Sequence, residues 1–143
     1  MKVFLSYPSE HETSAREVFQ FVRSVDIDCW FDKESIVAGE DWERARSIAQ
    51  RQADAVILLC GSQTTGRNGV YQREVSDALE AVRDRRLGAV YILPVKVEQV
   101  ELPPELSRFQ YVDLKDINWK RRLAGGLKRV ALDKGEIPSP SLL

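Results

Sequence analysis

Two parts of this chain carry residues that could do chemistry: the carboxylate of Glu74 and the polar segment 32–41. Apolar residues at helical spacing around Glu74, Tyr71 among them, predict that its side chain lies at the edge of a buried helix face. A carboxylate in such a place can bind sugar hydroxyls and stabilise positive charge that develops at an anomeric carbon. A solvated helix acid paired with Arg67 or Arg73 is the alternative, and spacing alone leaves it open.

Other catalytic and metal-binding machinery is poorly represented. The two cysteines, Cys29 and Cys60, fall in apolar runs, which predicts buried, reduced thiols. No CxxC pair or Cys/His cluster is present, so the sequence predicts no metal site. His11 is the only histidine, and it lies in the first turn of a predicted helix. A nucleophile activated by histidine is therefore not expected, because that machinery needs a base held beside the nucleophile.

Strands and helices alternate along most of the chain. Apolar runs and helical spacing predict strands at 2–6, 27–31, 55–60, 89–97 and 109–113, and helices at 10–25, 42–52, 70–86 and 118–132. Ser9 and Glu12 have the spacing of a capping box, and Pro94 predicts a bulge or strand end. The helix at 42–52 is expected to turn Ala45, Ile48, Ala49 and Ala53 inward.

This alternation predicts an α/β fold with a doubly wound parallel sheet of five strands, order 2-1-3-4-5, and helices on both faces. Ligands of such sheets bind at the carboxyl ends of the strands. That edge should carry Ser6 and Tyr7, the segment from Asp32 onward, Gly61 and the start of the 70–86 helix. A GxGxxG fingerprint, a phosphate-binding P-loop and the acid cluster of a phosphate-accepting receiver are all absent from the sequence.

Trp42 opens a helix directly after the long segment 32–41. An aromatic ring in that position could stack on a base or on nicotinamide, or it could anchor the core. Both interpretations of Trp42 stay open at this point.

The bulk properties describe one soluble globular domain. The chain has 143 residues, 43% hydrophobic and 30% charged, with a net charge of −1, so nothing draws it to nucleic acid or anionic membrane. No apolar run approaches the roughly 20 residues of a membrane span, and no signal peptide is evident, so a cytoplasmic location is expected. The expected boundaries are a domain at 1–133 and a C-terminal tail or linker at 134–143.

Five short motifs, in order along the chain, resemble those of TIR (Toll/interleukin-1 receptor) domains of bacterial type. They are Phe4-Leu5-Ser6-Tyr7, then Trp30-Phe31-Asp32 with Ala38-Gly39 and Trp42, then the strand at 55–60, then Val70-Tyr71-x-x-Glu74, then Ile92-Leu93-Pro94-Val95. The resemblance covers residues 1 to about 133. The fourth motif is similar to the helix segment that carries the glutamate of NAD-cleaving TIR domains.

The resemblance implies a flavodoxin-like fold and an NAD⁺ nucleosidase that releases nicotinamide and ADP-ribose, or a cyclic ADP-ribose isomer, in bacterial immune signalling. Glu74 would be the catalytic residue, and NAD⁺ would be a substrate in a reaction that needs no metal or other cofactor. The residues implied to line the NAD⁺ site are Ser6, Tyr7, Asp32, Gly39, Trp42 and Tyr71. The alternative is a non-catalytic TIR module that assembles with other TIR domains.

The implied partners are NAD⁺, other TIR domains that meet the segment 32–42, and a sensor domain or downstream effector; neither nucleic acid nor membrane is expected. Three departures from the family pattern concern the lining of the pocket. Val70-Tyr71 replaces a frequent aromatic-cysteine pair, Pro8-Ser9 replaces basic residues, and Arg46 stands where an apolar residue is common.

Overall fold

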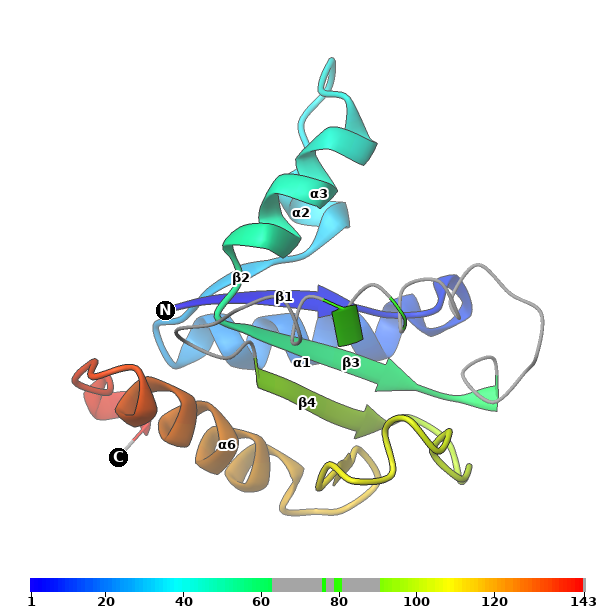
Figure 1. Cartoon of the computed structure of the whole chain (residues 1–143), viewed down its shortest axis with the longest axis vertical. Helices are drawn as coiled ribbons and strands as arrows, with labels where there is room; N and C mark the ends of the chain where they lie inside the picture. Colours follow the sequence, from blue (N-terminus) through cyan, green and yellow to red (C-terminus); the bar gives the residue numbers. More distant parts are fainter. Residues whose placement is uncertain (63–75, 77–78, 81–90, 143) are drawn as a thin grey trace.

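The computed structural model describes residues 1–62, 76, 79–80 and 91–142. Its strands form one parallel sheet of order β2-β1-β3-β4-β5, as the sequence predicts (Figure 1). The strands are β1 (Lys2–Ser6), β2 (Asp28–Trp30), β3 (Ala55–Cys60), β4 (Tyr91–Lys96) and β5 (Val112–Asp113). β3 lies at the centre and is buried along its whole length, which explains its continuous apolar sequence.

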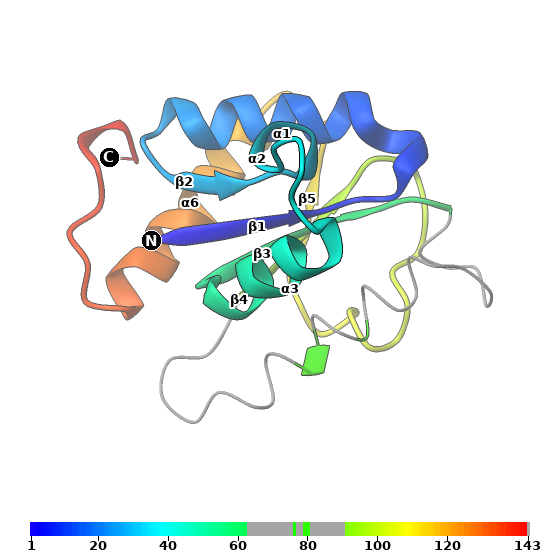
Figure 2. The same ribbon diagram turned by 90° about the horizontal axis from the view of Figure 1, so that it is seen from above.

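The two faces of the sheet carry different layers. On one face, α1 (Glu12–Ser24) and α6 (Trp119–Asp133) cover a large core that includes Leu5, Ile57 and Leu59. On the other, α3 (Trp42–Gln52) lies over a smaller cluster that includes Phe4 and Leu58 (Figure 2). Successive strand residues alternate between these layers because side chains of a strand point to opposite faces.

The entry to α1 differs from the predicted capping box. A 3-10 turn, η1 (Ser9–His11), precedes α1, and no side-chain hydrogen bond caps the start of either element. The backbone N–H of His11 donates instead to the carbonyl of Pro8, at 2.9 Å. A backbone turn thus takes the place that the sequence assigned to Ser9.

The segment after β2 is an arm that stands away from the sheet (Figure 1). It consists of α2 (Asp32–Ser35), a loop over residues 36–41 and α3, so the predicted loop contains a short helix. The inward face predicted for α3 is wrong at Ile48, which is 36% exposed, and Trp42 is no core anchor at 60% exposure. Ala53, just after the helix, is buried as predicted.

Pro94 does not interrupt β4, contrary to prediction. The β3–β4 ladder runs from Tyr91 to Lys96 and pairs Pro94 with Leu58. The backbone of Tyr91 and of Val97 donates toward β3, so the alternating pattern directs Pro94 away from β3. Its missing donor faces the open edge of β4, because β5 pairs only from Val95 onward.

The last two predicted elements match the structure unequally. α6 continues without a break through Gly125-Gly126, whereas β5 has two residues in place of the five predicted. The chain then folds back in η2 (Pro140–Leu142), where the buried Leu142 joins the core beside α6.

The helix predicted at 70–86 lies largely outside the described residues. Within the described part of the chain, no helix has the length and apolar character needed to cross a membrane.

Candidate functional site

The carboxyl ends of β1 and β2 are joined by a hydrogen bond between two residues that the sequence places in the site. The Tyr7 hydroxyl donates to Oδ1 of Asp32 at 2.6 Å, and the same oxygen accepts the backbone N–H of Lys33 at 3.0 Å. Ser6, the last residue of β1, is only 3% exposed. Ser6, Tyr7 and Asp32 therefore meet at one edge of the sheet, next to the β1/β3 switch point where ligands of this architecture bind.

Tyr7 is held as a neutral hydrogen-bond donor. Burial is the largest cause that raises the pKa of Tyr7 well above its usual value. The hydrogen bond to Asp32 and the negative charges of Asp32 and Glu12 raise it further, against a smaller opposing effect of Arg16. The hydroxyl therefore keeps its proton at neutral pH, so Tyr7 positions Asp32 and cannot act as a phenolate.

Local hydrogen bonds set the shape of the arm. Ser35 Oγ accepts the backbone N–H of Phe31 at 3.0 Å, and Glu40 Oε1 accepts that of Val37 at 2.8 Å. Asp41 caps α3 by accepting the backbone N–H of Arg44 at 3.2 Å. Gly39 has a φ of +91° and open space where a Cβ would lie, so the requirement for glycine is conformational rather than steric.

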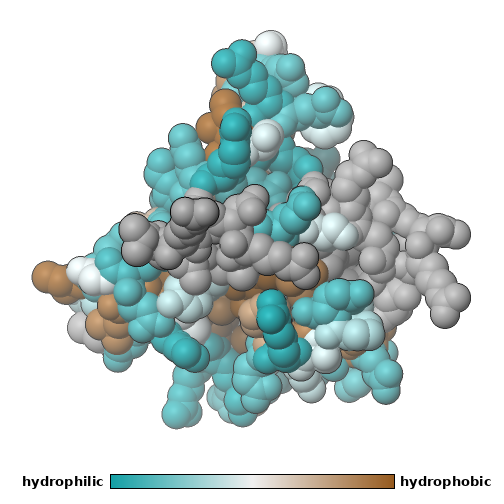
Figure 3. Space-filling view, viewed as in Figure 1, coloured by the Kyte–Doolittle hydropathy of each residue, from teal (hydrophilic) through white to brown (hydrophobic). Residues whose placement is uncertain are grey.

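The surface of the arm is polar, with a small apolar area near its tip (Figure 3). Val37 and Trp42 are 63% and 60% exposed. Ion pairs hold the base of the arm to α1: Arg16 contacts Glu34, and Lys33 Nζ lies 3.7 Å from Glu12 Oε1.

An aromatic and cationic cluster lies beneath α3. The rings of Phe4 in β1 and Trp30 in β2 stack with centroids 4.9 Å apart and planes at 6°. Arg46 of α3 places its guanidinium carbon 5.9 Å from the Phe4 centroid, and its Nη2 atom is buried. An arginine thus stands over the face of the sheet that Phe4 and Ser6 share by the alternation of β1.

A contact that sequence reasoning missed joins three strand ends. His11 Nε2, from the turn after β1, lies 2.7 Å from Glu98 Oε1, just beyond β4. The two atoms lie at ion-pair distance but form no directed hydrogen bond. A Cβ at Gly61, after β3, would stand 2.7 Å from His11 Nε2, so only glycine leaves room for the pair. His11 and Glu98 lie 87 positions apart in the sequence, and no local pattern signals their contact.

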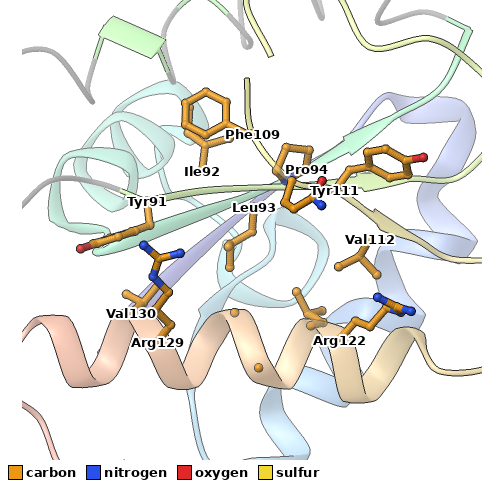
Figure 4. A pocket seen from close by; sticks show the side chains of 14 residues that line it. Tyr91, Ile92, Leu93, Pro94, Phe109, Tyr111, Val112, Arg122, Arg129 and Val130 are labelled. Atoms are coloured by element: carbon orange, nitrogen blue, oxygen red, sulfur yellow. The ribbon is translucent and has the colours of Figure 1, made fainter. Parts of the chain in front are cut away.

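A second feature that the sequence did not reveal is a groove between the open edge of β4 and α6 (Figure 4). Its volume is about 720 Å³. Tyr91 and Arg129 lie at one end of it, Val112 and Arg122 lie at the other, and Leu93 points toward the helix between them (Figure 4). Gly125 and Gly126 line the helix side, where the lack of side chains keeps the groove open.

The sequence-predicted site residues are only partly brought together. Tyr7 contacts Asp32 directly, and Ser6 lies beside Tyr7 in the chain. Gly39 and Trp42 belong to the arm, whose exposed surface faces solvent. Glu74 and Tyr71 lie outside the described residues, so their predicted roles stay predictions. Among the described residues, no group of three or more His, Cys, Asp or Glu side chains is arranged to hold a metal ion.

A family model for the TIR domain matches residues 3–127, most of the chain. The chain belongs to the TIR domain family. This is the family that the five sequence motifs resemble. No curated protein matches the chain.

Two solved structures show how far the TIR fold is shared. The TIR domain of the Toll-related receptor TRR-2 from Hydra magnipapillata aligns with a TM-score of 0.68 at 16% identity, over 89% of this chain and 94% of its own. A metazoan TIR-STING receptor from C. gigas, solved in complex with 2′,3′-cGAMP, aligns with a TM-score of 0.63 at 22% identity. That match covers 92% of this chain but 45% of the receptor, so this TIR domain spans about half of that protein. Identities this low show the shared fold alone.

Proposed function

We propose that this TIR domain cleaves the nicotinamide–ribose bond of NAD⁺, with Glu74 as the catalytic carboxylate, in immune signalling. The observation that supports this best is the Tyr7–Asp32 hydrogen bond of 2.6 Å, which joins two strand ends beside the buried Ser6. It creates a fixed polar rim at the edge where sheets of this order bind ligands. Membership of a family that includes NAD-cleaving enzymes supplies the substrate class.

The proposed reaction breaks the bond between ribose C1′ and the nicotinamide nitrogen. The electron pair of that bond leaves with nicotinamide, and positive charge develops on the ribose. The Glu74 carboxylate stabilises this oxocarbenium-like state through its negative charge and a contact to the ribose. Water then forms the new C–O bond at C1′ and releases one proton, which gives ADP-ribose; attack by an atom of the same nucleotide gives a cyclic isomer.

The rim residues have a positioning role in this proposal. Tyr7 keeps its proton and directs it to Asp32, so Asp32 is held at the start of α2 as a fixed acceptor. A carboxylate in that position can accept a hydrogen bond from a hydroxyl group of the substrate. Tyr7→Phe removes one of the two hydrogen bonds to Asp32 Oδ1 and leaves that from the Lys33 backbone, so we expect a higher KM for NAD⁺ with a smaller change in kcat.

The test follows nicotinamide release from NAD⁺ by the purified protein over a range of protein concentrations. Glu74→Gln removes the charge and keeps the shape, and we expect it to lower kcat by at least about 100-fold, the scale of one transition-state electrostatic contact. Glu80→Gln makes the same chemical change at an exposed position and should leave the rate unchanged. Equal rates for Glu74→Gln and the wild type would refute the proposal, as would the absence of release by the wild type.

A second function, assembly with further copies, is favoured by the match between the arm and the groove. Segment 32–41 carries four acidic residues and one lysine. It also contains the exposed Val37 and is followed directly by the exposed Trp42. The groove is mainly apolar and has Arg122 and Arg129 at its two ends. We propose that the arm of one copy docks into the groove of the next, a head-to-tail contact that leaves an arm and a groove free at the two ends.

Gly125 offers a clean way to test this docking. A Cβ at Gly125 would meet nothing within 4 Å, so the backbone there accepts a side chain, and the leucine of Gly125→Leu would occupy part of the groove. We expect sedimentation velocity to show concentration-dependent growth for the wild type and for Gly125→Ala, and monomer for Gly125→Leu. Undiminished growth in Gly125→Leu would exclude the groove as the docking surface. A wild type that stays monomeric at every concentration would exclude the assembly itself.

A further inference from the structure

Helix α6 and the turn before it carry a concentration of positive charge that the net charge of the chain conceals. Residues 115–134 contain seven lysines and arginines and two aspartates, although the whole chain has a net charge of −1. The rest of the chain is therefore acidic, and its acids include the four in segment 32–41. Figure 1 shows α6 and the arm with the strands between them, so regions of opposite charge lie on opposite sides of the domain.

Five residues form one stripe along the exposed side of α6. The residues that the helix buries are Trp119, Leu123, Leu127, Val130 and Ala131. At about 3.6 residues per turn, the opposite side carries Arg121, Gly125, Lys128 and Leu132. Ile117 precedes Arg121 by one helical turn, in the loop that leads into α6. This α6 stripe has two cations at its centre and an aliphatic side chain at each end, since Ile117 and Leu132 are 94% and 55% exposed.

Ion pairing distinguishes the cations of the α6 stripe from their neighbours on the helix. Arg122 and Arg129 pair with aspartates at 2.9 and 3.8 Å, and both arginines line the groove. Within the part of the chain that the structure describes, neither Arg121 nor Lys128 has a carboxylate partner. The charges of these two residues can therefore attract an external anion without the loss of a contact inside the domain.

We propose that the α6 stripe binds the surface of an anionic lipid membrane. A helix that lies in the plane of a membrane places its cations among the lipid headgroups and its aliphatic side chains at the boundary with the acyl chains. The α6 stripe has both kinds of group in one line. Between its cations lies Gly125, which has no side chain to hold the helix away from the surface. Because the apolar face of α6 is packed in the core, the contact is shallow and reversible.

The ends of the α6 stripe favour a lipid surface over a nucleic acid. A phosphate backbone could pair with Arg121 and Lys128, but it has no apolar layer for Ile117 and Leu132. Single strands are bound largely through stacking on aromatic rings, and the stripe contains none. The affinity for duplexes depends on many phosphate contacts, and two unpaired cations provide few of them.

Co-sedimentation of the purified protein with vesicles tests the proposal. Vesicles of equal parts phosphatidylglycerol and phosphatidylcholine should bind the protein at least about tenfold more strongly than vesicles of phosphatidylcholine alone. Added salt should weaken the binding, because it screens the charges. Equal binding to the two kinds of vesicle would overturn the proposal, as would the absence of binding to the anionic vesicles.

Substitutions in the α6 stripe show whether it makes the contact. Arg121→Gln with Lys128→Gln should lower the partition coefficient about 25-fold, or about fivefold for each cation. Ile117→Ser should lower it about fivefold, since a side chain at the headgroup boundary is only partly buried. Arg121→Lys with Lys128→Arg keeps both charges and should bind like the wild type. Arg44→Gln with Arg108→Gln removes the same charge at exposed positions outside α6 and is the matched control.

The remaining outcomes separate lipid from other partners. If the matched control loses as much binding as the double glutamine variant of the stripe, the attraction is not local to α6 and the proposal is overturned. Binding to a duplex oligonucleotide but not to anionic vesicles would identify a nucleic-acid surface and would also overturn it. Urea unfolding should give the same stability for all variants, because the substituted side chains are exposed. The proposal does not depend on NAD⁺ cleavage, since none of its residues belongs to the candidate NAD⁺ site.

Discussion

The helices α1 and α3 each connect two strands of the same sheet, but they are held in opposite ways. α1 has 13 residues and buries Ala15, Val18 and Val22 completely. α3 has 11 residues and buries none. The sheet faces differ accordingly, since the cluster under α1 and α6 contains most of the buried side chains that the structure describes. One helix is thus fixed by its apolar face and the other by its ends.

The difference shows which side of the sheet tolerates polar side chains beneath its helix. A helix fixed by packing cannot exchange an inward residue without loss of core contacts. α3 is fixed by the Asp41 cap and by the strand that follows the buried Ala53, so its inner side can carry Arg46 and small alanines. The aromatic cluster of Phe4 and Trp30 lies on this loosely packed side, whereas Tyr7 of the rim packs against the core on the α1 side.

The prediction with the largest expected effect compares the loss of an aromatic ring from the core under α1 with the loss of one from the arm. Phe31 is fully buried and lies 5.2 Å from the Phe19 ring and 5.5 Å from the Tyr7 ring. Phe31→Ala should lower the free energy of unfolding by about 3–5 kcal/mol, the usual loss for a buried phenylalanine. Trp42→Ala, a larger deletion on the arm, should change it by no more than about 0.5 kcal/mol. Urea unfolding measures both.

A result in which the two substitutions cost the same would break the comparison. It would mean that the arm packs on the domain in solution, and that the exposure of Trp42 is not the solution state. Sedimentation at the concentration used for unfolding separates this outcome from packing against a second copy.

The regular parts of the fold could be predicted from sequence because they are governed by local periodicity. The helical spacing of apolar residues in α1 predicts burial on one face, and the continuous apolar run of β3 predicts burial on both faces. Both predictions are confirmed. The strand order followed from the connection rules. Pro94 and Ile48 were mispredicted because their surroundings depend on another segment of the chain. Pro94 is tolerated in β4 because the short β5 leaves that part of the edge unpaired. Ile48 is exposed because the arm stands away from the sheet.

The candidate site was predictable as a set of residues but not as a geometry. Ser6, Tyr7 and Asp32 were placed at one edge by topology alone, yet nothing in the sequence states that Tyr7 donates to Asp32. The His11–Glu98 contact depends on the absence of a side chain at Gly61, a third strand end. Contacts of this kind are set by how three chain segments converge, and no short-range pattern encodes them.

The second prediction uses pH to probe the α1 side. Burial, helped by the charge of Asp28 and opposed by Arg23, raises the pKa of Cys29 to about 12 from a usual value of 9.0. Above pH 9 the unfolded thiol ionises and the folded one does not, so ionisation favours the unfolded state. The free energy of unfolding should therefore fall between pH 9 and 12, by up to about 1.4 kcal/mol per pH unit from this group.

Cys29→Ala removes this titration, so its loss of stability relative to the wild type should shrink as the pH rises from 9 to 11. Urea unfolding at fixed ionic strength gives the difference at each pH. A difference that stays constant over this range would show that water reaches Cys29, and the α1 side would then be less tightly closed than the comparison states.

The smallest expected effect concerns the end that fixes α3. Asp41→Ala removes the acceptor for the backbone N–H of Arg44 and should cost about 1 kcal/mol, whereas Asp41→Asn, which also caps helices well, should cost much less. Because α3 has no buried residue to hold it, the loss should be local: hydrogen exchange of α3 amides should accelerate while α1 amides stay protected. Equal acceleration in both helices would mean that the cap stabilises the whole domain. The arm would then be coupled to the core, and a ligand that orders the arm would also be expected to raise the stability of α1.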